Sequence, residues 1–422
     1  MSVSRRLNRV VVTGYGGICP LGGNSQDIWN AILAYRLGYT LVSHPNEDVV
    51  AKFFGHIPFH VDVSRFSKKL LKYLPRFSRL GLIAADEALS MAFGKDSRRS
   101  LDEIYSPHER GVIFGTGWGG EDDIAENGEA YTRQSLASPL SNIMAMPSVG
   151  SAAISMNWNL CGYQNTPVAA CASGSIAIGD AFEIIRSGRA KMMLAGGGES
   201  IRHPFSVWNI DILGALSKEQ ENERKACCPF SLDRSGFVLS EGAAVLCLEE
   251  YENAVTRGAP ILAEIIGYSN FSDAWDVTAP DPNLNGRMMV IQTALSQSKV
   301  AVQDIDYINA HGTSTPLNDL NETLALKKSF GKSVYNIPIS STKSYTGHLI
   351  AASGAMESIF CVKAIEESIA PATLNLLNPD PECDLDFIPN KHRVLPRLET
   401  ALNVNYGFGG SNSALLFSKA KL

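Results

Sequence analysis

The sequence predicts an α/β protein with buried, largely parallel sheets. Short apolar runs of strand type alternate with longer runs of helical periodicity along the 422 residues, and glycine-rich turns separate many of them. Hydrophobic residues make up 45% of the chain, which is enough for a large buried core and excludes a disordered protein. No low-complexity linker divides the chain, so we expect one continuous globule.

The expected elements follow one another in the same style in both halves. In the first half we expect strands at Asn8–Thr13, Gly111–Phe114 and Met192–Leu194, and a helix at Ile176–Ile185. In the second half we expect strands at Ala243–Leu248, Leu262–Gly267, Ile305–Ala310, Pro338–Ser341, Leu402–Asn405 and Ser413–Phe417, and helices at Met288–Gln297 and Gly354–Ile365. Glycine turns are expected at residues 14–17, 115–120, 196–198 and 407–410. Such alternation is typical of parallel sheets covered by helices.

The charge balance and the cysteine pattern exclude several classes of protein. The 37 Lys and Arg against 43 Asp and Glu give a net charge of -6, whereas a dedicated nucleic-acid binder is usually basic. No apolar run reaches the roughly 18 residues that a membrane-spanning helix needs. The eight cysteines are scattered without a CxxC pair, which indicates neither a disulfide framework nor a zinc site. We expect a cytoplasmic protein without a metal, a membrane anchor or a nucleic-acid partner.

Cys171 is the sharpest chemical signal. It lies between a β-type run at Pro167–Ala170 and the helix expected at Ile176–Ile185, and small residues surround it. Backbone N–H groups at a helix N-terminus favour the thiolate, which is the nucleophilic form of cysteine. The alternative is a small buried cysteine that only packs.

Two histidines follow expected strands. His311 ends the run Ile305–Ala310, and His348 follows Pro338–Ser341, with Lys343 between strand and histidine. Because α/β folds place their sites at the ends of parallel strands, these side chains are candidates for a site. Glu357 lies in the next helix and can pair with Lys343. The alternatives are a structural histidine and a surface loop with a helix cap.

Two glycine-rich turns offer backbone N–H groups. In the turn at residues 407–410, three glycines surround Phe408, and such a turn can bind an oxyanion or fill the core with its phenylalanine. The turn at residues 115–120 matches GxGxxG, the dinucleotide fingerprint, but no acidic residue ends a second strand about 20 residues later. A nucleotide-dependent oxidoreductase is therefore a competing hypothesis.

One Cys, two His and an N–H turn together suit acyl transfer through a thioester.

These four separated motifs, in this order, resemble the elongating β-ketoacyl-(acyl-carrier-protein) synthases of type II fatty-acid and polyketide synthesis. The resemblance covers nearly the whole chain, from Val10 to Asn412. It implies the thiolase fold: a five-layered αβαβα core from two similar halves, each with a mixed five-stranded sheet. It also places the nucleophilic cysteine in residues 1–258 and both histidines in residues 259–422.

The resemblance also implies the roles of the site residues. Cys171 takes the acyl chain, while His311 and His348 bind the malonyl carbonyl and assist decarboxylation. Lys343, with Glu357 as its partner, supports the site electrostatically. The N–H groups of Cys171 and Phe408 form the oxyanion hole, and Phe408 gates the acyl pocket. Thr313 and Thr315 contact the phosphopantetheine arm, and no other cofactor is expected.

The partners implied are an acyl carrier protein and a second ketosynthase-like chain. Carrier proteins of this class are acidic, and a basic run without an intervening acid offers a docking patch at Arg65, Lys68, Lys69, Lys72, Arg76 and Arg79. Trp118 stands where fatty-acid enzymes carry a smaller residue in the acyl tunnel. It favours a polyketide-type subunit in a heterodimer with a chain-length factor, although a homodimer is also compatible. A non-catalytic scaffold is the remaining alternative.

Overall fold

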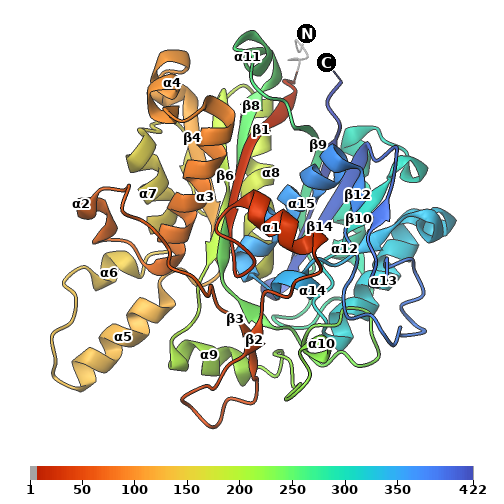
Figure 1. Cartoon of the computed structure of the whole chain (residues 1–422). Helices are drawn as coiled ribbons and strands as arrows, with labels where there is room; N and C mark the ends of the chain where they lie inside the picture. Colours follow the sequence, from red (N-terminus) through yellow and green to blue (C-terminus); the bar gives the residue numbers. More distant parts are fainter. Residues whose placement is uncertain (1–6, 422) are drawn as a thin grey trace.

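The computed structural model describes residues 7–421, and its main feature is a mixed sheet of ten strands (Figure 1). The strand order is β11-β10-β14-β15-β9-β1-β8-β6-β4-β5. Five neighbours come from the first half of the chain: β1 (Val10–Ile18), β4 (Arg110–Gly115), β5 (Gln164–Asn165), β6 (Met192–Glu199) and β8 (Gly242–Glu250). The other five come from the second half: β9 (Ala263–Ser272), β10 (Tyr307–Asn309), β11 (Ile339–Ser340), β14 (Thr400–Gly407) and β15 (Ser411–Ser418).

A short antiparallel ladder joins the two groups of five strands. Val10, Val11 and Val12 of β1 pair with Ile265, Glu264 and Ala263 of β9, after which β1 continues beside β8. Each group is otherwise a mixed five-stranded sheet of its own, with two parallel and two antiparallel pairs of neighbouring strands, so the expectation of largely parallel sheets is wrong. The two sheets of the predicted thiolase fold are therefore present and are hydrogen-bonded at one edge.

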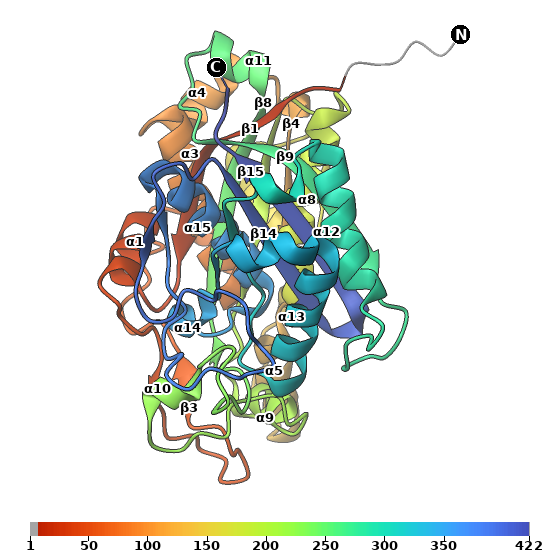
Figure 2. The same cartoon turned by 90° about the vertical axis from the view of Figure 1, so that its right-hand side faces the viewer.

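Helices cover both outer faces and fill the space between the sheets (Figures 1 and 2). The outer face of the first sheet carries α3 (Arg76–Phe93) and α7 (Val149–Trp158). The central layer holds α8 (Ser173–Arg186) and α15 (Ser353–Glu367), and the second outer face carries α12 (Asn285–Ser298) and α13 (Pro316–Phe330). The layers are thus α-β-α-β-α, as the resemblance to the β-ketoacyl synthases implies.

Side chains that point alternately to the two faces of each strand build these layers. In β4, Ile113 packs into the central core beside α8, whereas Val112 and Phe114 pack against α3 on the opposite face. Side chains of successive strand residues point to opposite faces, so apolar residues at every position mark a strand buried on both sides. This is why the strand runs of the sequence are continuously apolar.

Shorter elements surround this core. The helices are α1 (Ser25–Leu33), α2 (Lys68–Leu71), α4 (Ser97–Ile104), α5 (Glu121–Thr132), α6 (Ser141–Met144), α9 (Pro204–Asp211), α10 (Glu223–Ala226), α11 (Tyr251–Thr256) and α14 (Lys343–Thr346). Two small sheets are formed by β2 (Thr40–Leu41), β3 (Phe53–Gly55) and β7 (Leu239–Ser240), and by β12 (Ile369–Ala370) and β13 (Arg393–Val394). Between residues 7 and 421, no helix is both long and apolar enough to cross a bilayer.

Three local predictions are wrong. The glycines at 14–17 and 196–198 lie inside β1 and β6 instead of in turns, and residues 167–170 do not form a strand. The reason in β1 is close packing: a Cβ on Gly14 would lie 2.2 Å from the carbonyl oxygen of Ala88, and one on Gly16 would lie 2.2 Å from that of Ala84. Glycine therefore lets α3 approach the strand backbone.

Candidate active site

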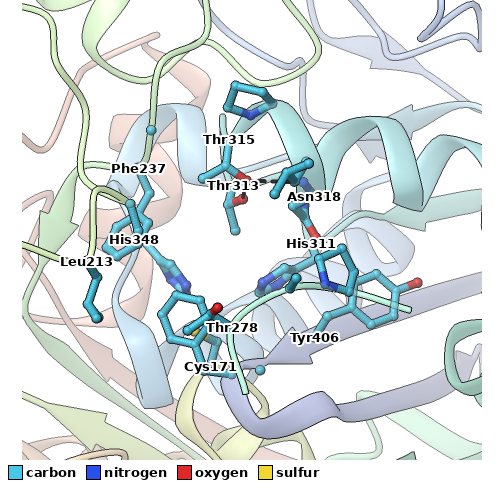
Figure 3. A pocket seen from close by; sticks show the side chains of 18 of the residues that line it. Cys171, Leu213, Phe237, Thr278, His311, Thr313, Thr315, Asn318, His348 and Tyr406 are labelled. Carbon is cyan, nitrogen blue, oxygen red and sulfur yellow. Dashed lines mark hydrogen bonds between the residues drawn. The ribbon is translucent and has the colours of Figure 1, made fainter. Parts of the chain in front are cut away.

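A cavity of about 380 Å³ lies where residues from both halves of the chain meet. Its lining includes Cys171 from the first half and His311, His348 and Phe408 from the second. Figure 3 shows the side chains of His311 and His348 entering from opposite sides and converging near Cys171. Residues far apart in the sequence therefore form one candidate site.

A tight backbone turn presents Cys171 at the start of α8. The 3-10 turn Ala170–Ala172 leads directly into the helix, and Ala170 has a φ of 47°, in the left-handed region that an alanine rarely adopts. The Ser173 hydroxyl accepts the N–H of Ala169 at 2.8 Å and lies 2.8 Å from the carbonyl oxygen of Ala170, to which it can donate. These contacts hold the backbone that carries the sulfur. The residue Cys171 as a whole is only 5% exposed.

The sulfur and the two imidazoles are in close reach of one another. The Sγ of Cys171 and one ring nitrogen each of His311 and His348 all lie within 4.8 Å. The two rings are 5.5 Å apart and nearly perpendicular, at 83°. A carbonyl group bound between them can therefore meet both rings and the sulfur. Thiol and imidazole are also zinc ligands, so this is the group among the described residues that could hold such an ion.

The hydrogen bonds around His348 determine which ring nitrogen carries the proton. Its Nδ1 accepts the N–H of Ile350 at 3.2 Å and lies 2.9 Å from the Ser353 hydroxyl. The proton is therefore assigned to Nε2, which is buried without a partner among the residues described. Burial, reinforced by the charge of Lys343, lowers the pKa of His348 well below its ordinary value. His348 is thus a neutral donor facing the cavity.

His311 is held in a similar way. Its backbone N–H and that of Gly312 donate to the Glu322 carboxylate at 2.7 and 2.8 Å. The Nζ of Lys343 lies 3.3 Å from Nδ1, which assigns the ring proton to Nε2. Burial, followed by the charge of Lys343, lowers the pKa of His311 well below its ordinary value. Both imidazoles can therefore donate to a carbonyl oxygen, and both stay uncharged at neutral pH.

Lys343 and Glu357 form a buried ion pair behind His311. The Nζ donates to the Glu357 carboxylate at 2.6 Å and to the His311 carbonyl oxygen at 2.7 Å. Asn405 donates to the second oxygen of Glu357 at 2.5 Å, so both carboxylate oxygens have partners. The pairing of Lys343 with Glu357 is present as the sequence suggested, and its role in the chemistry stays a prediction.

The expected thiolate at Cys171 is not supported by its surroundings. Burial raises the pKa of Cys171 to about 12, although the charge of Lys343 acts in the opposite direction. The Glu199 carboxylate raises the pKa further. The helix N-terminus is present, but the loss of hydration outweighs it, so the resting group is a thiol.

The turn at residues 407–410 lies against Cys171, as an oxyanion hole requires. The backbone N–H groups of Phe408 and Cys171 both act on the sulfur and lower its pKa, which places both donors beside it. Gly407 allows this approach, because a Cβ there would lie 2.5 Å from the Ala169 carbonyl oxygen. Phe408 lines the cavity, and its role as a gate of the acyl pocket stays a prediction.

The threonines and Trp118 lie on different sides of the site. Thr313 and Thr315 line the cavity above the histidines in Figure 3, with their hydroxyl oxygens 2.9 Å apart. Trp118 does not line this cavity and instead packs, partly buried, against the apolar cluster that contains Cys171, Val207 and Ile210. The polar cavity lined by the threonines and the apolar cluster that contains Trp118 therefore lie on different sides of the Cys171 sulfur.

The glycine turn at residues 115–120 is already occupied by a protein carboxylate. The N–H of Gly117 donates to Glu199 at 2.7 Å, and the Thr116 hydroxyl donates to the same group at 3.0 Å. Glu199 is fully buried, and burial raises its pKa to about 8. This turn therefore holds a side chain of the fold in the place where a dinucleotide phosphate would sit.

The basic run is only partly free for docking. Lys68, Lys69 and Lys72 are exposed on and beside α2. Arg65 is also exposed but pairs with Asp86 at 2.7 Å, and Arg76 pairs with buried Glu241 at 2.6 Å. A docking role for Arg65, Lys68, Lys69 and Lys72 stays a prediction.

Several supporting residues were not singled out from the sequence. Glu322 holds the His311 backbone, Ser353 contacts His348, and Asn405 holds Glu357. One signal was available: Asp319 and Glu322 lie on the same face of α13 as Leu326 and Phe330, and that face is buried. Acidic residues on an apolar helix face indicate carboxylates with specific partners.

Comparison with known proteins agrees with this geometry. The family model "Beta-ketoacyl synthase, N-terminal domain" matches residues 7–254, and "Beta-ketoacyl synthase, C-terminal domain" matches residues 262–377. The chain is 40% identical to 3-oxoacyl-(acyl-carrier-protein) synthase 2 of Synechocystis sp. over 97% of this chain and 98% of that protein.

Solved structures of ketosynthases are also similar. One is a type II polyketide synthase acyl-carrier protein in complex with its ketosynthase bound to the hexaketide, with 32% identity, a TM-score of 0.89 and coverage of 98% of this chain and 100% of that one. Another is the ishigamide ketosynthase/chain length factor, with 28% identity, a TM-score of 0.87 and the same coverage. The chain belongs to the β-ketoacyl synthase family, whose members are acyltransferases that form carbon–carbon bonds.

Proposed function

We propose that this chain is an elongating 3-oxoacyl-(acyl-carrier-protein) synthase of fatty-acid or type II polyketide synthesis, with Cys171 as its nucleophile. The observation that carries the proposal is the convergence of the Cys171 sulfur and two neutral imidazoles within 4.8 Å at one cavity. A thiol accepts an acyl group, and paired N–H donors stabilise the charge that develops on a thioester oxygen.

The first step is transfer of the acyl chain to the enzyme. The Cys171 sulfur attacks the carbonyl carbon of an acyl thioester, the bond from that carbon to the carrier sulfur breaks, and the carrier sulfur receives the thiol proton. The tetrahedral oxygen of the intermediate is held by the N–H groups of Cys171 and Phe408, which both lie against the sulfur. The acyl chain then occupies the apolar side near Trp118.

The second step condenses the chain with a malonyl thioester. The carbon–carbon bond to the malonyl carboxylate breaks, carbon dioxide leaves, and the electron pair forms an enolate whose oxygen accepts hydrogen bonds from His311 and His348. The enolate carbon attacks the acyl carbonyl, the bond to Cys171 breaks, and the released thiolate takes a proton from solvent. Neutral donors suit this step, because they stabilise the enolate without protonating its carbon.

We infer that substrates arrive on the phosphopantetheine arm of an acidic acyl carrier protein. Thr313 and Thr315 line the polar side of the cavity, where such an arm would pass. Lys68, Lys69 and Lys72 supply an exposed positive surface for the carrier. The similarity to a ketosynthase solved with its carrier protein supports this partner.

A second ketosynthase-like chain is the other proposed partner. β5 ends the ten-stranded sheet, and several large apolar side chains on the same part of the chain are exposed: Tyr131, Leu136, Met156 and Val168. The partner is a second copy or a chain-length factor, as in the ishigamide ketosynthase/chain length factor. We also propose residues 258 and 259 as the boundary between the halves, which lies between the ranges of the two family models.

The test separates acyl loading from condensation. Cys171→Ala should show no acyl group by intact mass after incubation with an acyl carrier protein. His311→Ala should load the chain but form no elongated product. Cys161→Ala is the matched control, because Cys161 is the exposed thiol and its removal should change neither reaction. Normal loading of the Cys171→Ala protein would refute the assignment.

A further inference from the structure

Arg287 is a buried cation on the wall of the catalytic cavity. It is 5% exposed, and it lines the cavity together with Asn318 and Tyr406. Its guanidinium donates to the side-chain and backbone oxygens of Asn318 at 3.0 and 3.3 Å, and its Nε has no partner among the residues described. A buried guanidinium held only by an amide and a carbonyl has donors left for a ligand.

The acidic residues nearby have donors of their own. Asp273 accepts from Asn412 at 2.8 Å, and Asp319 accepts the N–H of Phe230 at 2.9 Å. Glu322 accepts the two N–H groups behind His311. Within residues 7–421, none of these carboxylates forms an ion pair with Arg287, whereas Asp319 does lie 3.9 Å from Arg234. Arg287 is therefore free to pair with a carboxylate that arrives from outside.

Two helix N-termini add positive potential at this wall. Arg287 is in the first turn of α12, and α13 begins at Pro316 beside it, after the cavity-lining Thr315. The two helices contact each other and lie side by side in Figure 2. Because the positive end of a helix dipole favours anions, both helices reinforce the charge of Arg287.

The position of Arg287 indicates which anion it meets. Its guanidinium stacks on the Tyr406 ring at 4.0 Å, and that ring lies 5.6 Å from the His311 ring. In a malonyl thioester, the carboxylate carbon is two bonds from the carbonyl carbon that the histidines would hold. The pantetheine phosphate, in contrast, lies at the far end of the arm, many bonds from the thioester carbonyl. The buried cation thus matches the carboxylate.

We propose that Arg287 binds the carboxylate of the malonyl unit and makes the condensing site selective for a malonyl over an acetyl thioester. This proposal rests on the proposed function. A guanidinium and a carboxylate form a charge-assisted, planar pair. When the carbon–carbon bond breaks, the carboxylate leaves as neutral carbon dioxide, the ion pair is lost, and the electron pair remains on the enolate held by His311 and His348.

The experiment compares Arg287→Met and Arg287→Lys with Lys218→Met. Lys218 is the matched control, because it is an exposed cation that lines the same cavity. Two quantities are measured in each protein: the rate at which Cys171 is loaded from an acyl carrier protein, and the KM for malonyl carrier protein in condensation. Arg287→Met should raise this KM by about ten-fold or more while loading stays within about two-fold of wild type. Arg287→Lys should raise it less, and Lys218→Met should affect both quantities equally or not at all.

Two results would overturn the proposal. One is an unchanged KM for malonyl carrier protein in Arg287→Met, and the other is an equal loss of loading, which would mean that Arg287 only balances Asp273, Asp319 and Glu322. If Arg287→Met does not fold, the same two results are looked for in Arg287→Lys. That variant keeps the charge and loses the planar fork, so an unchanged KM or an equal loss of loading would again overturn the proposal. A wild-type protein that forms no condensation product refutes the proposed function instead, so the two failures are distinguishable.

Discussion

Lys343 and Glu357 form an ion pair of 2.6 Å, and their side chains are only 1% and 3% exposed. The lysine also donates to the His311 carbonyl oxygen and lies beside its Nδ1, so the pair joins α15 to the loop that carries a histidine of the site. Asn405 donates to the second oxygen of Glu357, so both carboxylate oxygens have a hydrogen-bond partner. The stability of this buried network depends on the presence of both charges.

Removing one partner of this pair should therefore be costly. We expect Lys343→Met to lower the free energy of unfolding by about 3–5 kcal/mol, because it leaves the Glu357 carboxylate buried and unpaired. The double variant Lys343→Met/Glu357→Met should recover much of that loss. Urea unfolding measures both values, and a single variant as stable as wild type would contradict the dependence on paired charges.

The raised pKa of Cys171 predicts a steep pH dependence of its alkylation. Since the thiolate is the reactive form, the rate with iodoacetamide should rise about ten-fold per pH unit and should not level off below pH 9. Glu199→Gln removes a charge that raises this pKa, so that variant should react faster at pH 9, where Glu199, with a pKa of about 8, is ionised in the wild type. Peptide mass spectrometry resolves Cys171 from the other thiols. A plateau near pH 7 would show that the resting group is a thiolate.

Trp118 should limit the length of the acyl chain. It packs against the apolar cluster that surrounds the Cys171 sulfur, and Trp118→Ala should open space there and shift the carrier-bound products to longer chains. Mass spectrometry of the carrier protein measures the product distribution. Trp275→Ala serves as the control, because that tryptophan is exposed. An unchanged distribution in a folded Trp118→Ala protein would place the chain elsewhere.

Charge reversal on and beside α2 should weaken carrier binding. Changing Lys68, Lys69 and Lys72 together to Glu should raise the KM for the acyl carrier protein and reduce its dependence on salt, since an acidic partner would lose its attraction. The control changes Lys299, Lys332 and Lys391 to Glu, which are also exposed and give the same net charge. Equal effects in both triple variants would mean that only the net charge matters.

Gly407 should be essential for the position of the nucleophile. Because a Cβ at this position would lie 2.5 Å from the Ala169 carbonyl oxygen, Gly407→Ala should displace either the turn or Cys171 and slow acyl loading by at least about ten-fold. Gly128→Ala is the control, since a Cβ there meets no atom within 4 Å. Loading at the wild-type rate in Gly407→Ala would show that the turn does not position the sulfur.

The fold could be predicted from the sequence because the strands are apolar on both faces. Runs such as Gly111–Phe114 have no other stable place than a sheet covered on two sides, and β4 is found there. The convergence of His311 and His348 follows from the parallel strands that precede them, since β10 pairs in parallel with β11 and β14.

Features that depend on long-range packing could not be predicted. Gly14 and Gly16 look like turn residues in the sequence, and only the approach of α3 explains them. The pKa of Cys171 depends on its depth of burial, which the sequence does not show, whereas the helix N-terminus that favours the thiolate is visible in the sequence. Similarly, the partners of Arg287 follow from how α12 and α13 meet.

The assembly of the site from both halves makes reactivity a late event in the life of the chain. The sulfur comes from the half synthesised first, whereas both imidazoles and the N–H of Phe408 come from the half synthesised last. On the proposed function, a polypeptide that lacks the second half holds the thiol without the two imidazoles and should not decarboxylate malonyl groups. Loss of extender units before the whole chain has folded should therefore be avoided.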